Sequence, residues 1–262
     1  IGAELYGEAG IDADVEIISV MLSLLTQAGI GLVHLDLSNV GVFRALANVA
    51  GLSDEQQSEL FDLLKLKCAT DTLAWVRREL SDATHIEAFS LLASMQGSAT
   101  SLVEKLEQLQ TLVPETATEI AHLQQVFDQL AIRFPETSMT CDLTELRGYD
   151  YHTGLVFAAY VPGYGDAIAQ GGRYDETGAV FGRARPATGF SADLKVLAQL
   201  GKREFTAKQT VAAPVSDDPV LWAAISQLRG EGIRVLIELN GDAVQCDQRL
   251  HQVDGQWKLT DA

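Results

Sequence analysis

The sequence predicts an α+β fold: an antiparallel sheet with helices and a helical insertion, followed by a small α/β domain. Segments with the alternation of β-strands, at 32–37 and 146–175, flank a block at 40–134 whose apolar residues recur with the period of a helix. Beyond residue 200, a polar link leads into a strand, a helix and another strand. The expected domains are a core at 1–206, with the helical insertion at about 52–136, and a small α/β domain at 207–262.

The first expected helix runs from residue 14 to residue 28. Apolar residues recur there every three or four positions, and Gly29 is a typical stop after a helix. Further apolar residues widen the apolar face, so we expect this helix to be buried on more than one side. A strand should follow at 32–37, where His34 and Asp36 alternate with apolar residues.

The helical block starts at Val40, and its helix boundaries are well marked. Gly51 ends the first helix, and Ser53 with Gln56 forms a capping box that opens the next. Thr116 with Glu119 is expected to open the last helix in the same way. The helices expected in this block lie at 40–50, from 54 onward, and at 72–79, 86–94, 100–112 and 116–134.

The segment from Leu146 to Asp175 predicts a β-hairpin, because two β-type runs flank a Pro-Gly turn. A hairpin folds its two ends together. Two cations, two carboxylates, aromatic hydroxyls and an imidazole should therefore share one region, a composition typical of a polar small-molecule pocket. These residues are Arg147, Asp150, Tyr151 and His152 at one end, and Gln170, Arg173, Tyr174 and Asp175 at the other.

The rest of the chain predicts a domain boundary and a small domain. The segment 186–200 begins with small residues and is expected to lead into a helix. The polar segment 201–209 is the expected boundary between the two domains. The tail then predicts a strand at 210–213, a helix from Asp218 and Pro219 to 229, a strand at 233–239 and a hairpin at Asp254-Gly255.

The composition argues against several classes of partner. Nineteen Lys and Arg against 36 Asp and Glu give a net charge of −17, which opposes binding to nucleic acid. No apolar run approaches the ~20 residues that cross a bilayer, so no membrane partner is expected. The sequence starts at Ile1 without Met or a targeting pattern, and we expect an upstream part to be missing.

Motifs for metals and cofactors are missing from the sequence. Cys68, Cys141 and Cys246 are widely scattered and lack zinc-ligand spacing, which indicates reduced thiols in a cytoplasmic protein and no structural metal. The Gly-Tyr-Gly and Gly-Gly segments match neither the P-loop nor the dinucleotide-binding pattern. We therefore expect no cofactor.

Three motifs, in this order, resemble the histidyl-tRNA synthetase family. They are Arg-Gly-Tyr-Asp-Tyr-His-Thr-Gly at 147–154, Gly-Gly-Arg-Tyr-Asp at 171–175 and Pro-Ala-Thr-Gly-Phe at 186–190. Glu4, in Gly-Ala-Glu-Leu-Tyr-Gly, and the segment 43–46 fit the same family. The resemblance covers most of residues 1–200 and implies a class II aminoacyl-tRNA synthetase-like fold with a histidine pocket.

The resemblance also implies roles for particular residues. Glu4 would receive the α-ammonium of histidine and Arg147 its carboxylate, since a zwitterion needs a fixed anion and a fixed cation. Tyr174 would face the imidazole, and His152 stands where the family has a second Tyr. Because Arg147 and His152 are five residues apart, both line one pocket only if the backbone bends, for example at Gly148. The expected histidine-binding residues are Glu4, Arg147, Tyr151, His152, Gly171, Gly172 and Tyr174.

Two departures from the family predict a protein that is not a catalyst. Catalytic members close the third motif with Gly-Leu-Glu-Arg, whose Arg neutralises ATP, whereas Val196 ends the aligned run here. The tail, of roughly 50 residues, is too short and not basic enough to hold an anticodon. The Arg-Gly-Tyr-Asp-Tyr-His-Thr-Gly segment at 147–154 and the Gly-Phe-Ser-Ala-Asp-Leu-Lys segment at 189–195 resemble in particular the regulatory subunits of ATP phosphoribosyltransferase, relatives that keep the pocket without charging tRNA. This resemblance implies binding of L-histidine, and activation and feedback regulation of the short-form catalytic subunit at the first step of histidine biosynthesis, as a homodimer within a hetero-oligomer.

Other interpretations remain open. Arg147 and Asp150 could form a structural ion pair, and a histidine such as His152 is more often a core or rim residue than a ligand contact. Lys65 and Lys67 fit a solvated helix face better than a phosphate site. The rival functions are an active histidyl-tRNA synthetase with an altered third motif, and an amino-acid-binding paralogue without a transferase partner.

Overall fold

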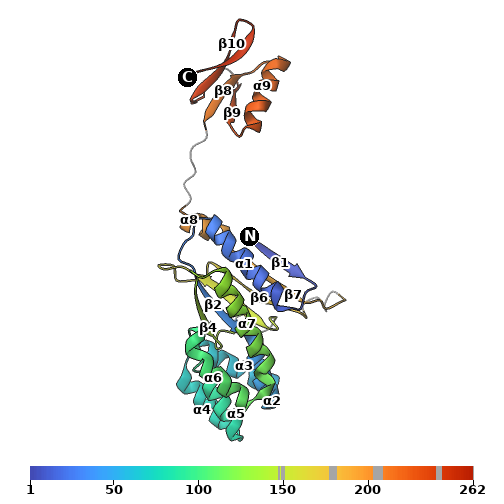
Figure 1. Ribbon diagram of the computed structural model, residues 1–262, viewed down its shortest axis with the longest axis vertical. Helices are drawn as coiled ribbons and strands as arrows, with labels where there is room; N and C mark the ends of the chain where they lie inside the picture. Colours follow the sequence, from blue (N-terminus) through green and yellow to red (C-terminus); the bar gives the residue numbers. More distant parts are fainter. Residues whose placement is uncertain (147, 149–150, 177–181, 203–208, 240–243, 262) are drawn as a thin grey trace. The chain divides into compact units, whose positions relative to one another are not determined.

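A computed structural model (Figure 1) describes residues 1–146, 148, 151–176, 182–202, 209–239 and 244–261. The chain divides into two units, Ile1–Arg203 and Glu204–Ala262. The boundary expected at 206–207 falls in residues 203–208, which lie outside the described part. No helix among the described residues has both the length and the apolar character needed to cross a membrane.

The first unit is built on a seven-stranded sheet with the strand order β1-β7-β6-β5-β2-β4-β3. Neighbouring strands are antiparallel except β2 and β4, which are parallel. The strands are β1 (Gly2–Tyr6), β2 (His34–Asn39), β3 (Gln96–Gly97), β4 (Ser138–Asp142), β5 (Leu155–Tyr160), β6 (Ala169–Arg173) and β7 (Ala187–Ala192).

The sheet is antiparallel, as expected, except for the one parallel pair of β2 and β4. Between β2 and β4 the chain passes through the whole helical block, and a long crossover of this kind lets it re-enter the sheet in the same direction. The expected strand at 32–37 is present as β2, whereas β1, β3 and β4 were not expected. These three are short, and β3 has only two residues, so their side-chain alternation gives little signal.

The helices of the first unit lie where the apolar period places them. The expected capping box is present, with Ser53 Oγ accepting from Gln56 N and Gln56 Oε1 accepting from Ser53 N. The helices are α1 (Ile11–Gln27), α2 (Val40–Val49), α3 (Asp54–Lys65), α4 (Ala69–Glu79), α5 (Ala83–Leu92), α6 (Ala99–Leu112), a 3-10 turn (Pro114–Thr116), α7 (Ala117–Arg133) and α8 (Leu194–Leu200).

The second expected capping box, at Thr116, is wrong. The Thr116 hydroxyl donates to the carbonyl of Val113 at 2.8 Å, and the Glu119 carboxylate accepts from Asn39 Nδ2 at 2.9 Å. A 3-10 turn leads directly into α7, so the backbone of Thr116 is already helical and its side chain cannot reach forward as a cap.

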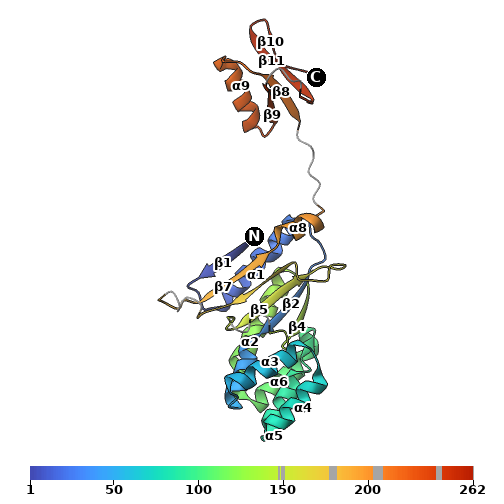
Figure 2. The same ribbon diagram turned by 180° about the vertical axis from the view of Figure 1, so that it is seen from behind.

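Helices α1 and α7 cover one face of the sheet (Figures 1 and 2). Ile18, Met21 and Leu25 of α1 are fully buried, and so are Leu35 and Leu37 of β2. The pairing of the strands shows which residues lie on the opposite face, because residues directly paired across neighbouring strands point to the same side of the sheet. One such row runs from Glu4 through Gly189, Gly172 and Val156 to Ser38.

Residues 186–200 differ from the expectation of a simple approach into a helix. Residues 187–192 form β7, which lies between β1 and β6 and pairs with both, and only then does α8 begin. The small side chains of β7 give little sign of a strand in the sequence. They also allow β1, β6 and the Glu4 side chain to lie close to β7.

The second unit is a four-stranded sheet, with the order β11-β10-β8-β9, and one helix. Its core is formed by Val211, Ala213, Leu221, Ile225, Val235 and Leu250. The expected hairpin is present, and Asp254 (φ 54°) and Gly255 (φ 76°) take the two left-handed positions of its turn. The elements are β8 (Thr210–Pro214), α9 (Pro219–Gly230), β9 (Arg234–Glu238), β10 (Gln248–Val253) and β11 (Gln256–Asp261).

Candidate functional site

A cavity of about 360 Å³ lies on the face of the sheet that α1 and α7 leave uncovered. This volume is in the range of small-molecule sites. Its floor comes from β1, β5, β6 and β7, and its walls from the turn before β5, the residues after β6, and α3. The lining residues are Glu4, Phe61, Lys65, Glu145, Gly148, Tyr151, His152, Val156, Phe157, Gln170, Gly171, Gly172, Tyr174, Gly189, Phe190 and Ser191.

Glu4 and Tyr174 form the polar centre of this cavity. The Glu4 carboxylate lies directly over Gly189, where an added Cβ would come 1.6 Å from Glu4 Oε2. The Tyr174 hydroxyl donates to Glu4 through a short hydrogen bond, and the ring of Tyr6 meets that of Tyr174 edge-on at 6.5 Å. Burial and the bond to the Glu4 carboxylate raise the pKa of Tyr174, so its hydroxyl stays a neutral donor at physiological pH.

His152 is held against the floor of the same cavity. It is 5% exposed, and an added Cβ on Gly172 would come 2.9 Å from its Nε2 atom. Arg44 donates to the His152 carbonyl at 3.1 Å, and the Tyr151 ring lies 4.2 Å from the imidazole. The glycine at 172 is therefore needed for the imidazole to approach the sheet.

A turn, not a strand, precedes β5. Gly148 has φ 63°, and its carbonyl accepts from the backbone N–H of His152 at 2.7 Å. The backbone therefore bends at Gly148, where the spacing of the pocket residues required it, and the strand starts only at Leu155.

The structure brings together six of the residues expected to bind histidine. Glu4, Tyr151, His152, Gly171, Gly172 and Tyr174 all line the cavity. The seventh, Arg147, lies outside the described residues, as does Asp150.

Helix α3 adds two lining residues, Phe61 and Lys65, that sequence patterns did not indicate. Lys65 and Lys67 are both exposed, as expected for a solvated helix face, and the Lys65 ammonium also lies 5.9 Å from the centre of the Phe61 ring at the cavity. Lys67 Nζ bonds Asp142 Oδ2 at 2.6 Å. Burial lowers the pKa of Lys67, but its hydrogen bond to Asp142 and the charge of that carboxylate raise the pKa overall. Only the tertiary structure shows either contact, since the partners lie in other elements or are brought near the sheet by the packing of α3.

Arg173 and Asp175, expected in the polar region at the hairpin ends, do not line the cavity. Arg173 pairs with Thr188 across the sheet, on the face that the helices cover, and it is 4% exposed. Its neighbour Tyr174, the first residue after β6, still bonds Ala187 of β7 through its backbone N–H, and its side chain lines the cavity on the opposite side. Arg173 therefore belongs to the fold and not to the binding site.

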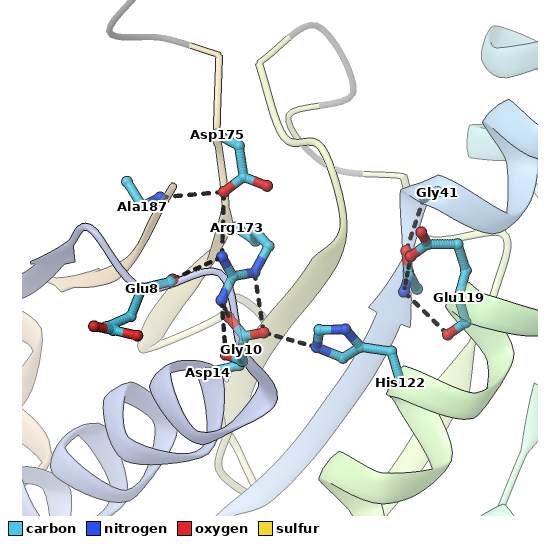
Figure 3. A network of polar contacts seen from close by, with 10 residues as sticks. Glu8, Gly10, Asp14, Gly41, Glu119, His122, Arg173, Asp175 and Ala187 are labelled. Atoms are coloured by element: carbon cyan, nitrogen blue, oxygen red, sulfur yellow. Dashed lines mark hydrogen bonds and ion pairs between the residues drawn. The ribbon is translucent and has the colours of Figure 1, made fainter. Parts of the chain in front are cut away.

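The Arg173 guanidinium is the centre of a buried polar network (Figure 3). Its Nε and Nη2 atoms meet the two oxygens of Asp14 at 3.1 and 3.0 Å. The remaining donors bond the carbonyls of Glu8 and Gly10 and the carboxylate of Asp175, each at 3.2 Å. His122 Nε2 lies 2.8 Å from Asp14. A buried charge pair with this many bonds is a structural feature.

The third-motif position, Val196, lies in the first turns of α8. Asp193 caps this helix by accepting from Lys195 N at 2.8 Å. Val196 is half-buried and packs against the main hydrophobic core, whereas Lys195 is exposed. No described residue of α8 lines the cavity.

No cluster of three or more His, Cys, Asp or Glu side chains within the described residues could hold a metal ion.

The mixed sheet, its two covering helices and the cavity define a histidyl-tRNA synthetase-like protein with the class II aminoacyl-tRNA synthetase fold. Residues 1–197 match the histidyl-tRNA synthetase family, and residues 208–260 match the C-terminal domain of the ATP phosphoribosyltransferase subunit HisZ. The chain belongs to the family of ATP phosphoribosyltransferase regulatory subunits.

Curated relatives carry that name over nearly the whole of this chain. The ATP phosphoribosyltransferase regulatory subunit of Cellvibrio japonicus is 43% identical, with 98% of this chain and 66% of the relative covered. That of Stutzerimonas stutzeri is 45% identical, with 99% and 67% covered. The chain thus spans about two thirds of the length of these relatives.

Solved structures share the fold at lower identity. Histidyl-tRNA synthetase from Nostoc sp. PCC 7120 superposes with a TM-score of 0.72 at 18% identity, covering 96% of this chain and 65% of that one. The ATP phosphoribosyl transferase (HisG:HisZ) complex from Thermotoga maritima gives a TM-score of 0.55 at 17% identity, covering 73% and 64%.

Proposed function

We propose that this protein is a regulatory subunit of ATP phosphoribosyltransferase that binds L-histidine in the cavity. It binds the short-form catalytic subunit, activates it and transmits feedback inhibition by histidine at the first step of histidine biosynthesis. Membership of the regulatory-subunit family supports the catalytic subunit as the partner, and the residues that line the cavity support histidine as the ligand.

The observation that carries the ligand assignment is the convergence of Glu4, Tyr174 and His152 on one cavity. The Glu4 carboxylate supplies a fixed anion for the α-ammonium of an amino acid. Tyr174 and His152 supply a neutral donor and an imidazole, the groups that a second imidazole can hydrogen-bond. Arg147 is the cation that the family resemblance assigns to the ligand carboxylate.

The same subunit is proposed to be non-catalytic and to need no cofactor. Val196 packs against the core at the position where catalytic relatives carry an ATP-binding Arg. A half-buried valine cannot neutralise phosphate. The three free cysteines support a location in the cytoplasm, where thiols stay reduced.

Calorimetric titration of the complete protein with L-histidine tests the ligand. We expect saturable binding of one histidine per subunit, with D-histidine and L-glutamine as controls that bind at least tenfold more weakly. Absence of binding by the complete protein would overturn the proposed site.

The alternative, an active histidyl-tRNA synthetase, is favoured by the family match over residues 1–197. Pyrophosphate exchange that depends on both histidine and ATP separates the two functions. Val196 predicts no exchange above background, and exchange at a rate typical of synthetases would establish the alternative.

Co-expression with the short catalytic subunit tests the partner. We expect a hetero-oligomer that contains a homodimer of this subunit, and a transferase rate that rises when the subunit is added. Histidine should shift the equilibrium between active and inhibited assemblies by a coupling free energy of about 1–3 kcal/mol. A subunit that binds histidine but neither co-purifies with the transferase nor activates it would be a stand-alone paralogue.

A further inference from the structure

One wall of the cavity comes from the helical block and not from the sheet. Helix α3 contributes Phe61 and Lys65, and the other described lining residues belong to the strands or to the segments next to them. Among the described lining residues, Lys65 is the one lysine or arginine, and Glu4 and Glu145 are the carboxylates. Lys65 is therefore the one described lining side chain with a full positive charge at neutral pH.

Lys65 and Glu4 approach the cavity from opposite sides. Glu4 lies on β1, at one edge of the sheet, whereas β4 lies near the other edge. Lys65 is the last residue of α3, and two residues later Lys67 bonds Asp142 at the end of β4. This bridge holds the end of α3 on the β4 side. The anion of the cavity lining thus comes from the edge of the sheet, and its described lysine comes from α3.

Lys65 is exposed at the cavity, and its described contact there is with the Phe61 ring. Its ammonium lies over the Phe61 ring at 5.9 Å, which keeps the alkyl stem against the cavity wall. No ion pair joins Lys65 to another described residue. In a chain of net charge −17, a lysine without such a partner at the cavity gives an anionic group a local positive contact.

We propose that Lys65 binds the carboxylate of the amino acid held in the cavity, as a second cation beside the one that the family provides. The inference rests on the proposed function, since it takes histidine as the ligand. It makes α3 a ligand-contacting helix. In the described part of the chain α3 packs chiefly on α4. A carboxylate bound by Lys65 would add a contact between the helical block and the part of the cavity that the sheet forms. Occupancy of the cavity is then transmitted to the helical block.

Matched ligands and variants test this assignment in the complete protein. Histidinol has an alcohol in place of the carboxylate, and the affinities of L-histidine and histidinol are measured by calorimetry for wild type, Lys65→Gln, Lys65→Arg and Lys105→Gln. Lys105 lies on α6 of the same helical block, is half-buried, does not line the cavity, and bonds only Ser94 among the described residues, so it is the control.

The expected result is selective. Lys65→Gln should weaken histidine binding about tenfold or more, because a charge-assisted hydrogen bond is lost, and should leave histidinol binding within about twofold of wild type. Lys65→Arg should keep most of the histidine affinity, and Lys105→Gln should bind both ligands as wild type does. Hydrogen exchange of residues 54–65 should slow on adding histidine to wild type but not to Lys65→Gln.

Each of the other possible outcomes would contradict a particular part of this assignment. If wild type binds histidine and Lys65→Gln binds it equally well, Lys65 does not contact the ligand. If Lys65→Gln loses affinity for histidine and histidinol alike, the lysine acts on the shape of the site and not on the carboxylate. If wild type binds neither ligand, the proposed function fails and this assignment fails with it.

Discussion

Both faces of the seven-stranded sheet carry charged side chains, but these differ in how many bonds they make within the protein. On the face that α1 and α7 cover, the Arg173 guanidinium has bonds to two carboxylates and two backbone carbonyls. On the open face, the Glu4 carboxylate is bonded by Tyr174 and otherwise lines the cavity. Arg173 and Tyr174 are consecutive residues, yet one is enclosed and the other faces ligand space.

This difference separates structural charges from binding charges. A buried charge must be bonded on all sides, because each unmet bond costs free energy. A charge in a binding site must keep an unused side for the ligand. Changes on the covered face should therefore reduce stability, and changes on the open face should reduce affinity.

The largest effect is expected on the covered face. Asp14→Ala leaves the Arg173 guanidinium buried without its main carboxylate, so the free energy of unfolding should fall by about 3–5 kcal/mol. Urea denaturation followed by circular dichroism measures this loss. Asp12→Ala, an exposed change in the first turn of the same helix, is the control and should cost less than about 1 kcal/mol. Equal losses in both variants would contradict a structural role for the network.

The next effect is expected at Glu4. Glu4→Gln removes the negative charge that faces the ligand ammonium, and histidine affinity should fall by about 1.5–3 kcal/mol. The free energy of unfolding should change little. Calorimetry with imidazolepropionate, which lacks the ammonium, supplies the control because its affinity should not fall. A parallel loss for both ligands would mean that Glu4 shapes the cavity and does not bind the ammonium.

A smaller effect, dependent on pH, is expected at Asp36 on the open face. Burial raises the pKa of this carboxyl above 3.8, and the Asp142 charge adds to the shift, although Thr140 donates to Asp36 and opposes it. The folded protein therefore holds this proton more tightly than the unfolded chain. Its stabilising contribution is present below pH 3.8 and is lost as pH rises through the raised pKa.

Asp36→Asn keeps an acceptor for Thr140 and removes the titration. Its stability relative to wild type should therefore increase as pH rises from about 3 to 7, by a fraction of the Asp14 effect. Denaturation of both proteins across this range measures the difference. A difference that is constant with pH would show that Asp36 does not titrate in this way.

The smallest effect concerns thiol reactivity. Cys141 is 1% exposed on the covered face, and burial raises the pKa of its thiol, so it should resist alkylation at pH 7.5. Cys68 is partly exposed and should react at least about tenfold faster. Mass spectrometry of iodoacetamide-treated protein measures both rates. Cys68→Ser should remove its fast-reacting site, and rapid labelling of Cys141 in the native protein would contradict the burial argument.

Local patterns predicted much of this fold. The Ser53 capping box, the Pro-Gly hairpin and the Asp254-Gly255 turn are all present, because each depends on residues within a few positions of one another. The long helices were also predicted, since each repeats its apolar period over several turns. Strand β7 was not, because its small side chains resemble a loop until two neighbouring strands pair with it.

By itself, the sequence determined which residues could form the site and where the backbone had to bend. The motifs selected Glu4, Tyr174 and His152, and Gly148 could supply the turn that their spacing required. Only the tertiary structure decided that Arg173 turns away from the cavity and that Lys65 turns toward it. The physical reason is that strand register and the docking of α3 place residues distant in the chain on one face, and no local pattern contains that information.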